Sequence, residues 1–340
     1  AGGFTQAVGG GVGQRLKDGY GVVSLSVEGS DISDNSMTIS GVTDARALGG
    51  GIGVSTKLPG KEDSGYAESL FGVIGSTVSG NIIDISAGGE AAPEAAGGGI
   101  FADNVRPKYA EGARVYAEGA RVVASTIANN QLSIVEGGNP RGAGLFLKGL
   151  PPESPGDEYA LGVFDTSIVG NTSSLNGVAN GGQVWLDAKY LEIINTLISG
   201  NEAQGDDDLY VSYSEVNGSG SAVFHGDVPP DQGFLPGVLA DPANLGPLQF
   251  NGSALLDDDQ PKYGFFGAVK TIALLEGSGA IDPTITTEIT PDECATEPTG
   301  FPDQRGYPRD PCSDIGAYEW SAERDGDELV DGAELAVPAT

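Results

Sequence analysis

Five stretches of the chain decide its fold: VEGSDISDN (residues 27–35), VIGSTVSGN (73–81), VVASTIANN (122–130), VFDTSIVGN (163–171) and IINTLISGN (193–201). Each begins with apolar residues, continues through a small or polar stretch to a β-branched residue, and ends in Asn. The apolar residues alternate with a small kink, which is the pattern of a short strand that buries one face. The repetition predicts one strand and one corner used five times.

A second phrase follows these stretches after variable gaps. Its copies are GGGIGV (49–54), GGGIFA (97–102), GAGLFL (142–147) and GGQVWL (181–186), with a worn copy in DDLYV (207–211). The glycines allow backbone angles closed to other residues, which suits a sharp corner between sheets. At the opposite corner we expect Asn in the left-handed conformation, bonded to the Asn of the next repeat. This predicts a structural ladder of Asn35, Asn81, Asn130, Asn171 and Asn201.

A single repeat of this kind cannot bury its apolar face alone, so stacked repeats must share one core. The gaps at 57–64, 88–96 and 149–157 hold Pro, Gly and charge, and they are interpreted as loops. Because crossovers between parallel strands are nearly always right-handed, we expect an all-β, right-handed parallel β-helix, or solenoid. A β-sandwich also has Gly-rich turns, but it has no reason to repeat the same Asn and Gly corners in register.

The composition limits the partners. Asp and Glu number 48 against 17 Lys and Arg, which gives a formal net charge of −31. Such a surface repels nucleic acid and anionic lipid, and it repels acidic polysaccharides unless divalent cations bridge the two. No run of 18 apolar residues is present and no leader begins at Ala1, so we interpret the chain as a mature, soluble product without membrane insertion. The partners that we expect are further copies of the chain, extracellular matrix or polysaccharide.

The two cysteines, Cys294 and Cys312, are interpreted as a disulfide because no His lies near them to complete a metal site. Closing this short loop contributes about 3 kcal/mol in the chain-entropy model. The pair predicts an oxidising, extracellular setting.

The two alternating phrases resemble the repeats of polymorphic outer-membrane proteins and other bacterial right-handed β-helix surface proteins. The C-terminal third is similar to the tail of bacterial choice-of-anchor Q proteins. Three boxes occur in the order of that family: LADPANLGPLQFNGS (239–253), VKTIALLEGSGAIDPTI (269–285) and DQRGYPRDPCSDIGAYEW (303–320). The chain departs from the family at 257–259, which is an Asp triplet, and at Gly279, where Pro is usual. The resemblance implies an exported protein at the bacterial cell surface, and it implies no particular activity.

These signals divide the chain into repeats over 1–226, a cap region with the disulfide over 227–320 and an acidic tail over 321–340. An uncapped solenoid end exposes strand edges, so we expect the strand run 271–275 and the segment 315–320 to cover the last rung. A buried ion network is expected within the cap, from Arg305 and Arg309 with Asp303, Asp310 and Asp314.

The acidic tail is the best candidate for a metal site, with calcium as the cofactor. Its acidic side chains fall at positions 1, 3, 5, 9 and 12 of a loop with EF-hand spacing: Glu323, Asp325, Asp327, Asp331 and Glu334. The tail is also similar to the calcium repeats of bacterial surface proteins. Glu328 stands where a Gly is usual, and a solvated acidic linker is the alternative. The Asp triplets at 206–208 and 257–259 are interpreted as exposed charge.

Many right-handed β-helices cleave polysaccharides, so an enzymatic function is the alternative to a structural one. A lyase needs a basic residue beside calcium-binding carboxylates. The best such patch has Arg106, Lys108, Arg114 and Arg121 near Asp103 and Tyr109, but its duplicated YAEGARV sequence indicates a structural repeat. His225 has no nucleophile motif around it and is interpreted as a loop residue.

The scattered aromatic residues Trp185, Trp320, Tyr210 and Tyr213 could form sugar-stacking platforms. Ordinary packing is the commoner role of single aromatic residues on strands.

The sequence therefore predicts a non-enzymatic secreted protein of the bacterial cell surface or extracellular matrix. It would be adhesive or would assemble into fibres through stacked solenoids. The alternative is a calcium-dependent polysaccharide lyase or glycoside hydrolase of the β-helix type. A groove lined by Arg or Lys with clustered acids favours the enzyme, and a face of Ser, Thr, Asn and Gly favours the structural role.

Overall fold

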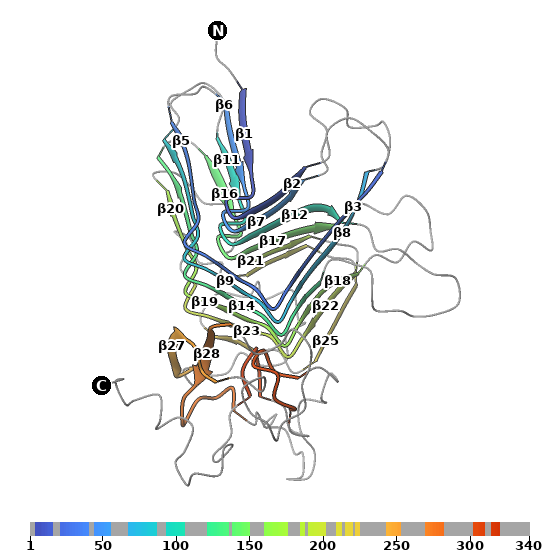
Figure 1. Cartoon of the computed structure of the whole chain (residues 1–340), viewed down its shortest axis with the longest axis vertical. Coiled ribbons are helices and arrows are strands. Elements are labelled where there is room, and N and C mark those ends of the chain that lie inside the picture. The colour runs from blue at the N-terminus through green and yellow to red at the C-terminus, as the bar shows by residue number, and fades with distance from the viewer. Residues whose placement is uncertain are drawn as a thin grey trace.

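The computed structural model consists of short strands stacked in parallel, with a smaller C-terminal part beside them (Figure 1). None of the described residues forms a helix, so none of them provides a helical segment able to cross a membrane. The structure describes residues 4–15, 21–40, 44–55, 67–86, 93–105, 121–135, 138–149, 160–175, 184–187, 190–201, 209–212, 215–219, 222–224, 243–252, 269–281, 302–309 and 314–319.

Two four-stranded sheets, here called A and D, lie on one side of the stack. Sheet A consists of β1 (Phe4–Val8), β6 (Asp44–Leu48), β11 (Glu94–Ala96) and β16 (Asn139–Arg141). Sheet D consists of β5 (Ser36–Ser40), β10 (Ile82–Ser86), β15 (Gln131–Ile134) and β20 (Thr172–Leu175).

Sheet B has two stacks of strands, joined where Val105 pairs with Ser69. Its first stack is β2 (Val12–Arg15), β7 (Ile52–Ser55), β12 (Ile100–Val105), β17 (Leu145–Gly149), β21 (Val184–Asp187) and β24 (Leu209–Ser212). Its second stack is β3 (Gly21–Glu28), β8 (Ala67–Ile74), β13 (Arg121–Val123), β18 (Ala160–Phe164), β22 (Tyr190–Ile194) and β25 (Glu215–Ser219). Sheet C consists of β4 (Asp31–Ser33), β9 (Thr77–Ser79), β14 (Thr126–Ala128), β19 (Ser167–Val169), β23 (Leu197–Ser199) and β26 (Ala222–Phe224).

The chain visits these sheets in a fixed order, and each pass makes one rung. The first rung is β1 to β5, the second β6 to β10, the third β11 to β15 and the fourth β16 to β20. In Figure 1 sheets A and D form one arm of a V, the two stacks of sheet B form the other arm, and sheet C lies between them. All pairings between rungs are parallel, as expected for a β-solenoid-like stack.

The apolar residues of equivalent strands lie above one another and form a continuous core. In sheet C the central residue of each strand faces inward, and the register aligns Ile32, Val78, Ile127, Ile168 and Ile198. This column belongs to the main core between sheets B and C. A second cluster of Ile, Leu, Met and Ala fills the space between sheets A and D. Burial in one shared core is what makes each short strand stable.

The corners follow the repeated phrases, with one difference. At the corner between sheets A and B the first Gly of the three described phrases has a positive φ, as expected: 70° at Gly49, 64° at Gly97 and 58° at Gly142. The sequence analysis did not include the same corner in the first rung, where Gly9 has a φ of 71°. At the corner before sheet D the expectation that the ladder Asn is left-handed is wrong. The preceding residue takes that conformation, as Asn129 does with a φ of 56°, because the ladder Asn must turn its amide inward.

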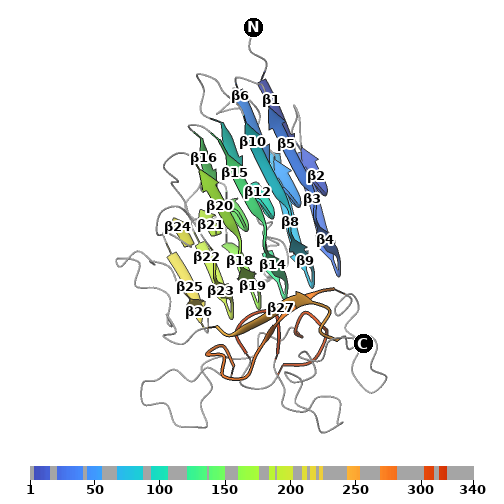
Figure 2. The ribbon, with the colours of Figure 1, turned by 90° about the vertical axis from the view of Figure 1, so that its left-hand side faces the viewer.

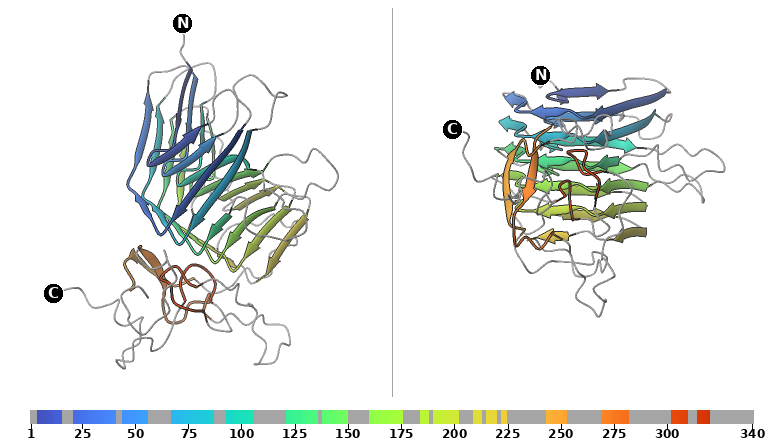
Figure 3. Two further views of the ribbon diagram at one scale, coloured as in Figure 1. Left: turned by 45° about the vertical axis from the view of Figure 1, so that its right-hand side comes forward. Right: turned by 60° about the horizontal axis from the view of Figure 1, so that its bottom comes forward.

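The described residues of the run 271–275 and of the segment 315–319 lie along the outer face of sheet C and not over the last rung, so that expectation is wrong for them. The C-terminal part contains an antiparallel hairpin of β27 (Leu245–Gln249) and β28 (Thr271–Leu274). Figure 2 shows β27 crossing alongside the strands of sheet C. The right-hand view of Figure 3 shows the orange and red segment lying beside several rungs. The described residues from 243 to 319 are called the C-terminal segment below.

In the first three rungs the second Gly of the corner between sheets A and B lies directly against the backbone of the next rung, at Gly10, Gly50 and Gly98. A Cβ added at Gly98 would lie 2.3 Å from the Ala143 carbonyl oxygen, a distance that only a backbone shift can relieve. At Gly72, in the middle of β8, the nearest atom to an added Cβ is the Ser26 Oγ at 3.7 Å.

We therefore expect Gly98→Ala to destabilise the protein by roughly 3 kcal/mol, the upper range for overpacking. Gly72→Ala, the matched control, should be neutral or stabilise by up to about 1 kcal/mol, because Ala restricts the unfolded chain. Urea unfolding monitored by circular dichroism measures both. Equal effects of the two substitutions would contradict the close contact at the corner.

Candidate functional site

The repeated Asn residues form a hydrogen-bonded column through the stack. The side-chain Nδ2 of each donates to the Oδ1 of the next at 2.9 Å, over the four steps from Asn35 to Asn201. The backbone N–H of each upper Asn donates to the same oxygen at 3.0–3.1 Å. A second Nδ2 bond reaches back to a carbonyl of sheet C, for example from Asn130 to Val78 at 3.0 Å. Asn35 is half-buried, the other four amides are buried, and all five bond to one another, so their role is to hold the rungs together.

A second polar column lies at the corner between sheets B and C, and the sequence analysis missed it. It consists of hydroxyl residues two places after the last residue of the sheet B strand: Ser30, Ser76, Ser125, Thr166 and Thr196. The backbone N–H of Ser76 donates to the Ser125 Oγ at 3.2 Å, and that of Ser30 donates to the Ser76 Oγ at 3.1 Å. The Ser125 and Thr166 hydroxyls donate to carbonyls of their own rung. The invariant Ser or Thr at this place in all five quoted stretches was the available signal.

The outer face of sheet C carries the contact surface for the C-terminal segment. The first residues of its strands are aligned in register: Asp31, Thr77, Thr126, Ser167 and Leu197. The Gln304 amide bridges two rungs, because its Nε2 donates to the Thr77 Oγ1 at 3.0 Å and its Oε1 accepts from the Thr126 Oγ1 at 2.5 Å.

The next rungs are contacted through backbone donors and apolar packing. The backbone N–H of Ala317 donates to the Ser167 Oγ at 2.9 Å, and that of Gly316 donates to the Asn195 carbonyl at 3.0 Å. Leu197 packs into a cluster with Ile315 and Tyr318 of the C-terminal segment. One continuous segment therefore contacts the rungs that carry Thr77, Thr126, Ser167 and Leu197.

Among the described residues, the C-terminal segment reaches the first rung through an exposed ion pair. The Lys270 ammonium lies 3.6 Å from the Asp31 carboxylate, and both side chains are about a third or more exposed to solvent. Exposed pairs of this kind contribute little to stability.

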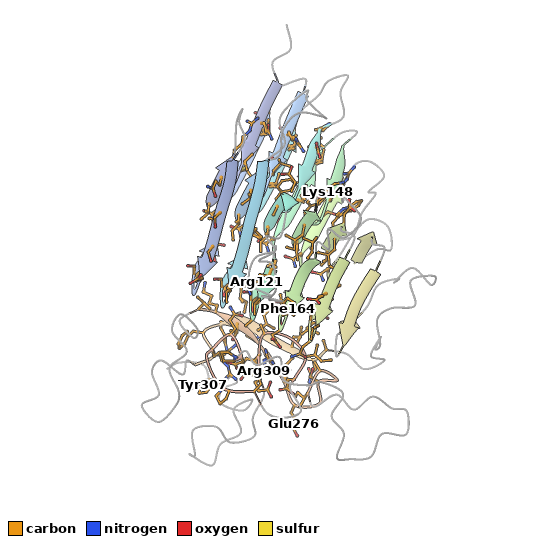
Figure 4. All side chains as sticks on the ribbon, turned by 90° about the vertical axis from the view of Figure 1, so that its right-hand side faces the viewer. Arg121, Lys148, Phe164, Glu276, Tyr307 and Arg309 are labelled. Carbon is orange, nitrogen blue, oxygen red and sulfur yellow. The ribbon has the colours of Figure 1, made fainter. Side chains whose placement is uncertain are left out.

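Buried ion pairs complete this contact. The Arg309 guanidinium lies 3.4 Å from the Asp165 carboxylate of the stack and 3.0 Å from Glu319. These side chains are at most 1 % exposed. Figure 4 labels Arg309 and Tyr307 within the C-terminal segment, below the strands of the stack. Burial by itself lowers the pKa of the Arg309 guanidinium, but the neighbouring carboxylates outweigh it and the pKa is raised, so the side chain stays charged.

A second guanidinium sits in the same region. Arg305 pairs with Asp303 at 2.9 Å and lies over the rings of Tyr307 and Tyr318. Backbone N–H groups satisfy the remaining carboxylate oxygens, as where Tyr307 and Arg305 donate to the Asp303 Oδ1 at 2.9 Å. Of the expected network of Arg305 and Arg309 with Asp303, Asp310 and Asp314, the pair of Arg305 with Asp303 is present. Arg309 pairs instead with Asp165 and Glu319 and donates to the Asp314 backbone carbonyl, and Asp310 lies outside the described residues. Because these carboxylates are buried and hydrogen-bonded, they offer no acid pair to a polysaccharide.

Asp165 is a functional residue that sequence reasoning passed over. It occupies the corner position that is Gly29, Gly75 and Ala124 in earlier rungs, and its φ is 48°. The Asn195 Nδ2 of the next rung donates to its Oδ1 at 2.7 Å. Asp tolerates the left-handed conformation of this corner, so the sequence carried no signal of a basic partner.

The aromatic residues of sheet B are stacked on one another. The ring centroids of Phe101 and Phe146 are 5.0 Å apart, and those of Phe146 and Trp185 are 5.9 Å apart. The Arg141 guanidinium lies 5.1 Å from the Trp185 ring. Because the ring faces contact neighbouring rings and a guanidinium, they are used for packing, and the stack is not a row of open sugar platforms.

The basic patch considered for a lyase is only partly described. Asp103 is buried and accepts a hydrogen bond from the Ser55 Oγ at 3.4 Å in the first stack of sheet B. Arg121 lies in β13 of the second stack. Arg106, Lys108, Arg114 and Tyr109 lie outside the described residues, as do His225, Tyr213, Trp320 and both Asp triplets.

The remaining predicted site residues also lie outside the described part. These are Cys294 and Cys312, and the calcium candidates Glu323, Asp325, Asp327, Asp331 and Glu334. Within the described ranges, no three acidic, His or Cys side chains come together in a group able to hold a metal ion.

Comparisons of the chain with family models, with curated proteins and with solved structures found no match.

The ion pair between the stack and the C-terminal segment gives a test of how the two are joined. Arg309→Gln leaves the Asp165 and Glu319 carboxylates buried without their cation, so we expect a loss of roughly 3–5 kcal/mol in unfolding free energy. Lys270→Gln removes only the exposed pair with Asp31 and should cost less than about 1 kcal/mol. Urea unfolding measures both variants.

Hydrogen exchange adds a local readout for the same variant. The Ala317 and Gly316 amides donate to the stack, so they should exchange faster in Arg309→Gln than in Lys270→Gln. Equal stability and equal exchange in the two variants would show that the buried ion pair does not fasten the segment.

Proposed function

We propose that the chain is a non-enzymatic structural protein of the bacterial cell surface or extracellular matrix, folded as a right-handed β-solenoid. In this role the stack is a rigid rod that carries the connections between its strands as adhesive loops, or that joins to other copies. The observation that carries the proposal is that the repeated polar side chains face inward and bond to one another. The Asn column is the main example, because it uses its donors and acceptors for cohesion between rungs.

The outer face of sheet D supports the same role. Outward residues alternate with buried ones along its strands, and Asp84 is the one charged residue among them. The outward residues are Ser36, Thr38, Ser40, Ile82, Asp84, Ser86, Gln131, Ser133, Val135, Thr172 and Ser174. A face of mostly hydroxyl side chains with the single carboxylate of Asp84 lacks the paired acids or the set of metal ligands that polysaccharide cleavage uses. This is the kind of face that we expect of a structural protein.

Two sequence features support an extracellular role for this rod, and a general rule supports its handedness. The net charge of −31 disfavours nucleic acid and anionic lipid as partners. The boxes at 239–253, 269–285 and 303–320 resemble the tail of bacterial choice-of-anchor Q surface proteins. Right-handedness follows from the general rule for crossovers between parallel strands.

A cleavage screen separates this role from that of a lyase or hydrolase. We expect the purified chain to release neither unsaturated uronates nor new reducing ends from a panel of acidic and neutral polysaccharides, with or without calcium. Negative-stain electron microscopy of the same samples should show short rods or assemblies of rods. Turnover of one polysaccharide that scales with protein concentration would replace the structural role with the enzymatic alternative.

Calcium binding by the acidic tail is a separate part of the proposal. We expect one calcium ion to bind the full chain with a dissociation constant on the order of 10⁻⁴ to 10⁻³ M, as in other extracellular modules. Asp327→Ala should abolish this binding in a calorimetric titration, whereas Asp257→Ala, in an Asp triplet interpreted as exposed charge, should leave it intact. Equal, weak binding by both variants would indicate a solvated acidic linker.

A further inference from the structure

The outer face of sheet D carries its polar side chains in columns. Figure 2 faces this sheet, with β5, β10, β15 and β20 side by side. Parallel pairing aligns the outward residues across the rungs, and successive members of a column are about 4.8 Å apart, the spacing of paired strands. Two columns cross all four strands. The first is Ser36, Ile82, Gln131 and Thr172, and the second is Thr38, Asp84, Ser133 and Ser174.

The core and the Asn column hold the backbone beneath this face. Buried residues such as Ile83, Ile85 and Leu132 alternate with the outward ones and pack in the cluster between sheets A and D. The Asn column lies directly before each strand and joins it to the next rung. The columns are therefore pre-organised, and a ligand does not have to order the strands when it binds.

The side chains of this face keep their hydrogen-bonding capacity for a partner. Within the described ranges, none of the outward side chains of sheet D forms a hydrogen bond or an ion pair with another residue. The corresponding hydroxyl groups of sheet C are occupied, because Thr77 and Thr126 both bond to Gln304 of the C-terminal segment. Sheet D continues from sheet C at the Asn column (Figure 1). Its outer face therefore extends an interface that the chain already uses, but without a cover of the same kind.

The Gln304 contact shows which chemical group such a column binds. The Gln304 amide lies across two rungs, with its Nε2 donating to the Thr77 Oγ1 at 3.0 Å and its Oε1 accepting from the Thr126 Oγ1 at 2.5 Å. An uncharged amide suits this place because it carries donors and an acceptor side by side, and a hydroxyl group can act as either. A partner with repeated, uncharged amide groups would find the same geometry on sheet D.

Charge and exposure limit what this partner can be. The net charge of −31 repels anionic polymers, and it attracts cationic ones to no particular face. The outward residues of sheet D include a single charged side chain, Asp84, so this face suits an uncharged partner. The side chains of Ile82 and Val135 are 37 % and 42 % exposed, and they offer apolar contact to the C–H faces of sugar rings.

We propose that the outer face of sheet D binds an uncharged polysaccharide whose sugars carry acetamido groups. Each acetamido group has the N–H and C=O of an amide, and it would bridge hydroxyl groups of neighbouring rungs, such as Ser133 and Ser174. A polymer that lies across the rungs makes many weak contacts of this kind at once, so they add up to firm binding. The inference rests on the proposed structural role, and it names the chemistry of the partner and the face that binds it.

The test measures binding of the full chain to chitin, an uncharged polymer with one acetamido group per sugar. Cellulose is the matched control polymer, because it has the same linkage and lacks the acetamido group. We expect binding to chitin and not to cellulose. Binding should not change as salt is added, because the partner carries no charge for salt to screen. Alginate, an anionic polysaccharide, should not bind.

Two serine variants locate the binding face. Ser133→Glu puts a longer, charged side chain into the second column and removes a hydroxyl donor, so the affinity for chitin should fall on the order of tenfold, which is the loss of one or two hydrogen bonds. Ser24→Glu changes an exposed serine of β3, in sheet B, and should bind as wild type does. Circular dichroism and thermal unfolding check that both variants are folded, and Thr38→Glu is the second face variant if Ser133→Glu is not.

Four outcomes would overturn the inference. They are no binding to chitin, equal binding to chitin and cellulose, equal loss of binding in Ser133→Glu and Ser24→Glu, and a wild-type dimer that Ser133→Glu alone dissociates in sedimentation equilibrium. The last outcome would assign the face to a second copy of the chain. Release of soluble sugars from chitin would refute the proposed non-enzymatic role without bearing on where the chain binds. Absence of chitin binding would leave that role intact.

Discussion

Hydrogen bonding between successive rungs is the constraint on which the rest of this structure depends. Each strand in the stack is only three to eight residues long, and its stability comes from pairing with the strands of neighbouring rungs and from inward side chains that join a shared core. A residue at one point of a rung must therefore suit the residues above and below it. This requirement explains why the same residue types repeat along the sequence.

The Asn column shows the constraint most directly. A buried amide has two donors and an acceptor to satisfy, and here the neighbouring rungs satisfy them at the same position each time. Replacing one Asn would leave groups unpaired on both of its neighbours. The hydroxyl column beside it follows the same logic, with Ser and Thr bonding to backbone atoms of their own and adjacent rungs.

The C-terminal segment adds a second way of joining the rungs, across the stack instead of along the strands. Gln304 bonds to two rungs at once, and Arg309 reaches the Asp165 carboxylate at a corner of the fourth rung. Local opening of one rung therefore disturbs contacts that also hold its neighbours. Such coupling favours a rod that opens as a unit, which suits a protein whose proposed work is mechanical and extracellular.

The sequence alone determined the stack of strands. Each repeat occupies the same surroundings in the stack, so the same residue types recur at the same positions and the pattern is visible within each short stretch. Period-two patterning indicated the strands, the glycine phrase indicated one corner, and the five Asn residues indicated the column. Sequence reasoning also paired Arg305 with Asp303, two residues away, but it did not name Asp165 or Glu319 as the partners of Arg309. Only the tertiary structure decided where the C-terminal segment lies, since Gln304 and Thr77 are 227 residues apart and neither carries a signal for the other. It also placed the left-handed residue before each ladder Asn, because the inward direction of the amide is set by packing against the next rung.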